Sequence, residues 1–75
     1  MRTLKQLKPG ARCSIKKVHG DGASYQRLLE MGLIEGTKLT VVRFAPLGDP
    51  MEIHFHDFNL SLRASEADKV EVVDE

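Results

Sequence analysis

Two strand-like segments flank a proline-rich turn near the middle of this 75-residue chain. In the segment after the turn, Met51, Ile53 and Phe55 alternate with polar residues. This period of two is typical of a strand with one face toward a core and the other toward water. The segment before the turn, residues 37–44, is rich in the β-branched and aromatic residues that favour strands. We therefore expect the chain to be organised around a β-hairpin.

The turn between these segments consists of Ala45, Pro46, Leu47, Gly48, Asp49 and Pro50. It is longer than a tight hairpin connection, and its prolines stiffen it. A stiff loop that projects from a sheet is a natural place for recognition, so these residues form a candidate partner-binding site. The alternative is a plain hairpin connection, and the residues alone do not choose between the two.

The segment before the hairpin predicts a strand and a short helix. Alternation over residues 11–18 indicates the strand, with Cys13 facing inward as an inert core thiol, and a change of apolar parity within it suggests a bulge. The apolar face of the helix consists of Tyr25, Leu28 and Leu29. Either Asp21 or Ser24 is its expected N-cap, and Gly32 is its expected left-handed C-terminal residue.

The segment after the hairpin predicts a turn, a fourth strand and a fifth. The apolar parity changes near Asp57, which tolerates the left-handed conformation that a turn requires. Residues 58–63 then read as a strand whose Phe58 and Leu60 face the core, and residues 64–67 as one helical turn. A valine-rich strand follows. Arg63 is placed to pair with Glu66, three residues later.

Five short strands with several bends predict a mainly β fold. The chain is too small for two packed sheets, so we expect one domain over residues 1–75, a small SH3-like five-stranded barrel with one short inserted α-helix. Closure of the sheet on itself would remove edges that promote aggregation.

The charge balance restricts the expected partners. Eleven basic and eleven acidic residues give a formal net charge of zero, which argues against nucleic-acid binding and favours self-association into a homo-oligomer. One cysteine excludes an internal disulfide and suits a reducing compartment. Without a signal-peptide-like or membrane-spanning run, we expect a cytoplasmic protein that does not insert into membranes.

A polar face of the second hairpin strand carries candidate metal ligands. On a strand, His54, His56 and Glu52 point the same way, and imidazole and carboxylate groups suit a divalent transition metal such as iron or zinc. The alternative is a polar strand face with no ligand. No phosphate loop or paired catalytic motif is present, so we expect no enzyme activity.

The order of several motifs resembles the FeoA family over nearly the whole chain. These motifs are Leu4 and Leu7 before Pro9-Gly10, residues 27–33 (RLLEMGL), Gly36-Thr37, residues 45–50 (APLGDP), and residues 60–63 (LSLR) with Glu66-Ala67. The APLGDP loop and the LSLR-x-x-EA ending are the most specific of them.

The resemblance implies a non-catalytic cytoplasmic accessory protein of bacterial ferrous iron uptake. Its implied partner is the membrane GTPase permease FeoB. Similar domains occur at the C-terminus of DtxR-type metal-dependent repressors, so the alternative is a small transition-metal-binding or metal-sensing module.

Overall fold

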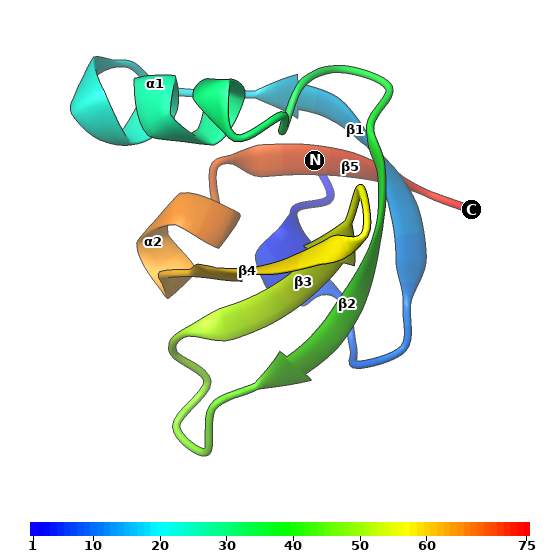
Figure 1. Cartoon of the computed structure of the whole chain (residues 1–75). Coiled ribbons are helices and arrows are strands. Elements are labelled where there is room, and N and C mark those ends of the chain that lie inside the picture. The colour runs from blue at the N-terminus through cyan, green and yellow to red at the C-terminus, as the bar shows by residue number, and fades with distance from the viewer.

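The computed structural model describes residues 1–75, which form a five-stranded antiparallel sheet with short helical segments (Figure 1). In chain order the elements are the 3-10 turn η1 (Leu4–Gln6), β1 (Arg12–Val18), α1 (Gly22–Glu30), β2 (Lys38–Phe44), β3 (Met51–Phe55), β4 (Phe58–Leu62), α2 (Ala64–Ala67) and β5 (Val70–Asp74). This mainly β architecture confirms the predicted fold class. Neither α-helix has the length and apolarity that crossing a lipid bilayer requires.

The strands lie in the order β4-β3-β2-β1-β5, so β4 and β5 are the two edges of a strongly curved sheet. The expectation that the sheet closes fully on itself is wrong, because no ladder joins β4 to β5. The connection between them forms the helical turn α2 instead of a hairpin. The N-terminal segment covers the edge of β5, where the Val72 N–H donates to the Arg2 carbonyl at 2.8 Å.

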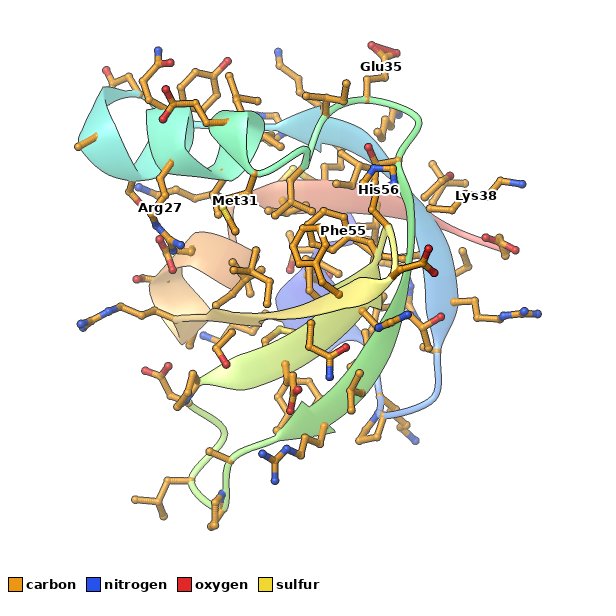
Figure 2. All side chains as sticks on the ribbon, in the orientation of Figure 1. Arg27, Met31, Glu35, Lys38, Phe55 and His56 are labelled. Carbon is orange, nitrogen blue, oxygen red and sulfur yellow. The ribbon has the colours of Figure 1, made fainter.

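The turn between β3 and β4 contains two consecutive residues in the left-handed region, His56 with φ 50° and Asp57 with φ 65°. The prediction for Asp57 is confirmed, whereas His56 was expected to continue the strand. Two positive φ values define the type I′ turn that joins tightly twisted strands. The turn allows Phe55 to point into the interior, while His56 lies beside the loop that follows α1 (Figure 2).

The short helix α1 begins after Asp21 and ends before Gly32, whose φ of 103° is the predicted left-handed conformation. The choice of cap is also settled: Asp21 occupies the N-cap position, but its side chain makes no capping hydrogen bond. The hydroxyl of Ser24 instead donates to Glu66 of α2. A helix of this length needs such tertiary contacts, because it is marginal alone in water.

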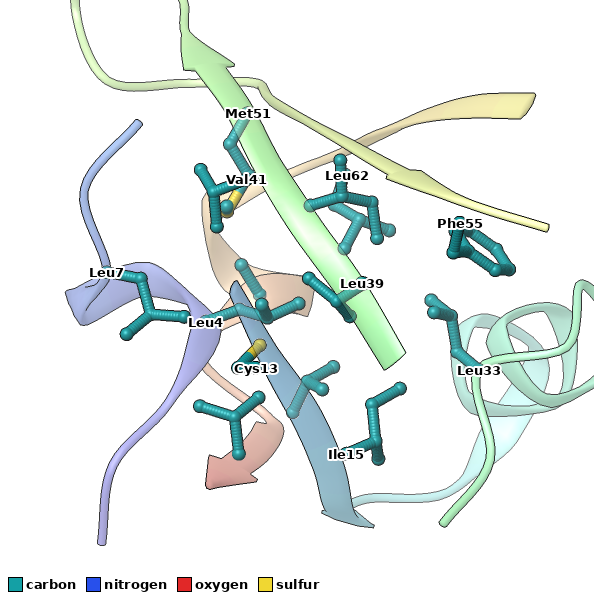
Figure 3. Packing of buried hydrophobic residues seen from close by; sticks show 14 of the residues in the cluster. Leu4, Leu7, Cys13, Ile15, Leu33, Leu39, Val41, Met51, Phe55 and Leu62 are labelled. Atoms are coloured by element: carbon teal, nitrogen blue, oxygen red, sulfur yellow. The ribbon is translucent and has the colours of Figure 1, made fainter. Parts of the chain in front are cut away.

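The core is one cluster of 16 buried hydrophobic residues that lie on the concave side of the sheet (Figure 3). It includes the alternating Met51, Ile53 and Phe55, as predicted, and Cys13, whose inward orientation is confirmed. The sheet bends at the predicted bulge in β1, between Ile15 and Lys17. The expectation that Phe58 lies in the core is wrong in part: its ring contacts Phe55 at 4.7 Å between centroids but stays 39% exposed, because β4 is an edge.

Candidate partner-binding site

The loop of residues 45–50 projects from the sheet at the end opposite α1 (Figure 1). At its tip, Leu47 is 96% exposed, the most exposed large hydrophobic residue of the chain. Two short hydrogen bonds hold the loop closed: the Ala45 N–H donates to the Pro50 carbonyl at 2.9 Å, and the Gly48 N–H donates to the Ala45 carbonyl at 2.7 Å. Gly48 takes the φ of 86° that the turn requires.

The base of the loop is tied to α2. The Oδ1 of Asp49 accepts a hydrogen bond of 2.9 Å from the backbone N–H of Ala64. Ala64 is the first residue of α2, so its N–H has no partner within the helix. Asp49 therefore has a structural role at the base of the loop, whereas Leu47 makes the loop's apolar surface.

Glu66 connects α2 to α1 and is the most constrained charged group in the chain. One carboxylate oxygen accepts from Ser24 Oγ and from Arg27, each at 2.7 Å, and the other accepts from the Arg63 backbone N–H at 3.0 Å. Figure 2 shows Arg27 extending from α1 toward α2. Burial alone would raise the pKa of Glu66, but these hydrogen bonds outweigh it and lower the pKa to about 2.

The ion pair of Glu66 differs from the one expected. Its partner is Arg27, 39 residues away, and the Arg63 side chain is exposed and makes no ion pair. Sequence spacing contains no signal for this contact, because the curvature of the sheet brings α1 and α2 together. Arg63 instead lines a shallow hollow beside the loop of residues 45–50, together with Arg27 and Asp49.

A chain of polar contacts crosses the outer face of β2, β3 and β4. Arg43 donates to Glu52 at 2.8 Å, the Asn59 amide donates to the other Glu52 oxygen at 2.7 Å, and His54 Nδ1 contacts Asn59 Oδ1 at 2.6 Å. Hydrogen bonds from Arg43 and then Asn59 lower the pKa of Glu52. Because the Asn59 oxygen accepts, His54 Nδ1 donates this hydrogen bond, and no hydrogen bond engages His54 Nε2.

The three predicted metal ligands are not gathered into one centre. Glu52 is held by Arg43 and Asn59, and His56 leaves the strand through its positive φ. His56 turns toward the segment that follows α1, where a Cβ at Gly32 would lie 3.5 Å from the His56 Cδ2 atom. His54 and His56 do line one shallow hollow, but no group of three or more His, Cys, Asp or Glu side chains lies close enough to hold a metal ion.

Comparison with known proteins gives one consistent result. The family model described as "FeoA domain" matches residues 2–74. The chain is 44% identical over 69 residues to the "Fe(2+) transport protein A/Fe(2+) transporter FeoB fusion protein" of Porphyromonas gingivalis. These residues make up 92% of this chain. The chain spans 8% of the length of that curated relative.

Solved structures of similar chains share the fold. The solution structure of the FeoA protein from Chlorobium tepidum has a TM-score of 0.88 and 41% identity, covering 95% of this chain and 68% of that one. The crystal structure of Stenotrophomonas maltophilia FeoA complexed with zinc has a TM-score of 0.85 and 28% identity. The match covers 97% of this chain and 91% of that one. That protein is described as a prokaryotic SH3 domain protein and put forward as a ferrous iron transport activating factor.

Proposed function

This chain belongs to the FeoA family, and from that premise we propose that residues 1–75 form a single non-catalytic, cytoplasmic accessory domain of bacterial ferrous iron uptake. Its partner in this proposal is a FeoB-like membrane GTPase permease, which it binds or regulates. The P. gingivalis relative supports the pairing, because that protein carries a transport protein A segment and a FeoB transporter in one polypeptide.

The observation that carries the proposal is the exposure of Leu47 on a braced loop. Leu47 is 96% exposed, and the loop around it is held by its own hydrogen bonds and by the contact of Asp49 with Ala64. An apolar side chain on a preorganised loop loses little conformational freedom when it docks, so most of its burial contributes to affinity. Leu47 is therefore the proposed anchor, and residues 45–50 are the proposed partner-binding surface.

The test measures the affinity of the Leu47→Ala variant for an immobilised FeoB-like cytoplasmic domain. We expect this variant to keep the wild-type circular dichroism spectrum and melting temperature, because the side chain contacts solvent, and to lose about tenfold or more in affinity. Val73→Ala is the matched control, since Val73 is 51% exposed on β5, away from the loop. Capture at wild-type strength by Leu47→Ala would remove the anchor from the proposal.

A second candidate function is that of a small transition-metal-binding or metal-sensing module. It is supported by the free Nε2 of His54 and by the shared hollow of His54 and His56. Glu52 does not fit as a third ligand, because both its oxygens are hydrogen-bonded. This candidate is therefore an open, exchangeable contact with iron or zinc rather than a closed centre.

Calorimetric titration with Zn²⁺ or Fe²⁺ tests the second candidate. If the imidazoles bind metal, the double variant His54→Ala/His56→Ala abolishes the heat of binding. The control His19→Ala leaves that heat unchanged, because the His19 imidazole is instead hydrogen-bonded to Glu71 at 2.8 Å. Equal affinity in the double variant and the wild type would eliminate the candidate.

A further inference from the structure

The two edges of the sheet differ in how they are covered. The edge strand β5 carries Glu71 and Asp74, and the N-terminal segment pairs with it through the Arg2 carbonyl and a bridge from Thr3 to Glu71. The edge strand β4, with the sequence FNLSL, has no charged residue and no proline. Exposed edges of natural sheets are normally protected by charge, proline, bulges or a covering segment, so an edge that lacks charge and proline invites pairing.

The free backbone groups of β4 can be identified from its register. Phe58 pairs with Phe55 next to the two-residue turn, so this pair is hydrogen-bonded, and bonded and non-bonded pairs then alternate along the ladder. Asn59 and Ser61 fall in non-bonded pairs, which point their N–H and C=O groups away from β3. No hydrogen bond outside the ladders engages the backbone of either residue, and both residues are exposed.

We propose that β4 is a homodimer interface, in which β4 of a second copy of this chain pairs antiparallel with it about a two-fold axis at Leu60. This register places Asn59 opposite Ser61 of the other copy, and Ser61 opposite Asn59, so all the free backbone groups find partners at once. An uncharged strand can pair with its own copy without like-charge repulsion. This inference does not depend on the proposed function.

The charges beside β4 complement each other in the same register. Asp57 precedes the strand and Arg63 follows it, and neither makes an ion pair within the chain. Antiparallel pairing about Leu60 brings the end of β4 next to Asp57 in each copy beside the end next to Arg63 in the other. Opposite charges across a strand pair are favourable, and a parallel arrangement would instead place like charges together. The charge pattern therefore selects the antiparallel second copy as the occupant.

The apolar side chains of β4 also fit this arrangement. Phe58 is 39% exposed and Leu60 is half-buried, although both share the core-facing side of the sheet with the buried Leu62. In the dimer the two Leu60 side chains face each other on the axis, and Phe58 lies opposite Leu62 of the other copy. The interface would thus cover the apolar surface that the incomplete closure of the sheet leaves open.

A cysteine on the axis tests the geometry directly. In a non-hydrogen-bonded antiparallel pair the Cα atoms lie about 4.5 Å apart, within the range of about 4.4–6.8 Å that a disulfide spans. Oxidised Leu60→Cys is expected to run as a disulfide-linked pair of 8.4 kDa chains. Val42→Cys is the matched control, because Val42 is a 38% exposed residue of the interior strand β2, and the native Cys13 is fully buried. Equal cross-linking of the two variants overturns the proposal.

Two further measurements do not depend on a new thiol. Hydrogen exchange of the wild type should show that the Asn59 and Ser61 amides become protected as protein concentration rises, at the same concentrations at which sedimentation detects the dimer. Ser61→Pro removes one of these donors on a strand edge where proline is tolerated, and should weaken dimerisation about tenfold or more. Leu47→Ala should leave it unchanged.

The outcomes separate this proposal from its rivals. A chain that remains monomeric at millimolar concentration, with these amides exchanging freely, overturns it. Protection of the two amides by an extended segment of another protein, with the chain itself monomeric, also overturns it and assigns the edge to that occupant. A dimer that survives Ser61→Pro uses a different surface, which again contradicts pairing through β4.

Discussion

The Asp49 carboxylate accepts a 2.9 Å hydrogen bond from the backbone N–H of Ala64, 15 residues later in the chain. This contact joins the base of the loop that carries Leu47 to the first residue of α2. In turn α2 contains Glu66, which holds α1 through Arg27 and Ser24. The exposed loop is thus connected by side-chain hydrogen bonds to both helices, although it lies at the far end of the sheet.

Asp49→Ala should reduce the free energy of unfolding by about 1 kcal/mol, because it leaves the first N–H of α2 without a side-chain acceptor. Urea unfolding followed by circular dichroism measures the change. Asp49→Asn is the control, since its amide oxygen can accept the same hydrogen bond, and it should stay close to wild type. Equal stability of the alanine variant and the wild type would show that solvent replaces the contact at no cost.

The Glu66 carboxylate should make the stability of the protein depend on pH in the acidic range. Its folded pKa of about 2 lies below the ordinary value of 4.5, so the native state binds this proton less readily than the unfolded state does. The stabilisation is complete above about pH 4.5 and is lost as the pH falls toward about 2. At about 1.4 kcal/mol per pKa unit it amounts to about 3 kcal/mol.

Glu66→Gln isolates this contribution. The variant should be less stable than the wild type at pH 7, and the difference should shrink as the pH is lowered from 4.5 to 2, as measured by thermal unfolding across that range. Glu30→Gln, which changes an exposed residue of α1, is the control. It should change neither the stability at pH 7 nor the dependence of stability on pH. A constant difference between Glu66→Gln and the wild type at all pH values would contradict the role assigned to the charge.

The Cys13 thiol should be unreactive in the folded protein. Burial raises its pKa from 9.0 to about 11, and the nearby charges of Asp74 and Glu75 add to the effect. At pH 8 its reaction with a disulfide reagent should be at least about a hundredfold slower than in the urea-unfolded chain, because the thiolate is the nucleophile and the site is closed to the reagent. A rapid reaction of the native protein would place Cys13 at the surface.

Local patterns in the sequence predicted much of the sheet. The alternation of Met51, Ile53 and Phe55 gave the buried face of β3, and the broken parity near Asp57 located the turn to β4. Both are short-range features, because a strand alternates its faces regardless of its neighbours. The same rule failed at His56, where the strand pattern continues in the sequence but the backbone has already entered the turn.

Contacts between distant segments were not predictable in this way. Phe58 is exposed because β4 is an edge strand. β4 is an edge because the chain continues after it through α2 to β5 at the opposite edge of the sheet. The pairing of Glu66 with Arg27 rather than Arg63 depends on the packing of α1 against α2. Spacing along the chain favoured an ion pair between Glu66 and Arg63. At the start of α2, however, the backbone N–H of Arg63 donates to Glu66, and the Arg63 guanidinium makes no ion pair.

The sequence by itself determined the strands, the projecting loop of residues 45–50 and the family, because hydrophobic periodicity, turn residues and motifs can be read directly from the chain. Only the tertiary structure decided that the sheet remains open between β4 and β5, that Glu52, His54 and His56 do not form a three-ligand group, and that Asp49 and Glu66 brace the loop and the helices. These features arise from the curvature of the sheet, which sets distances between residues that are far apart in the chain.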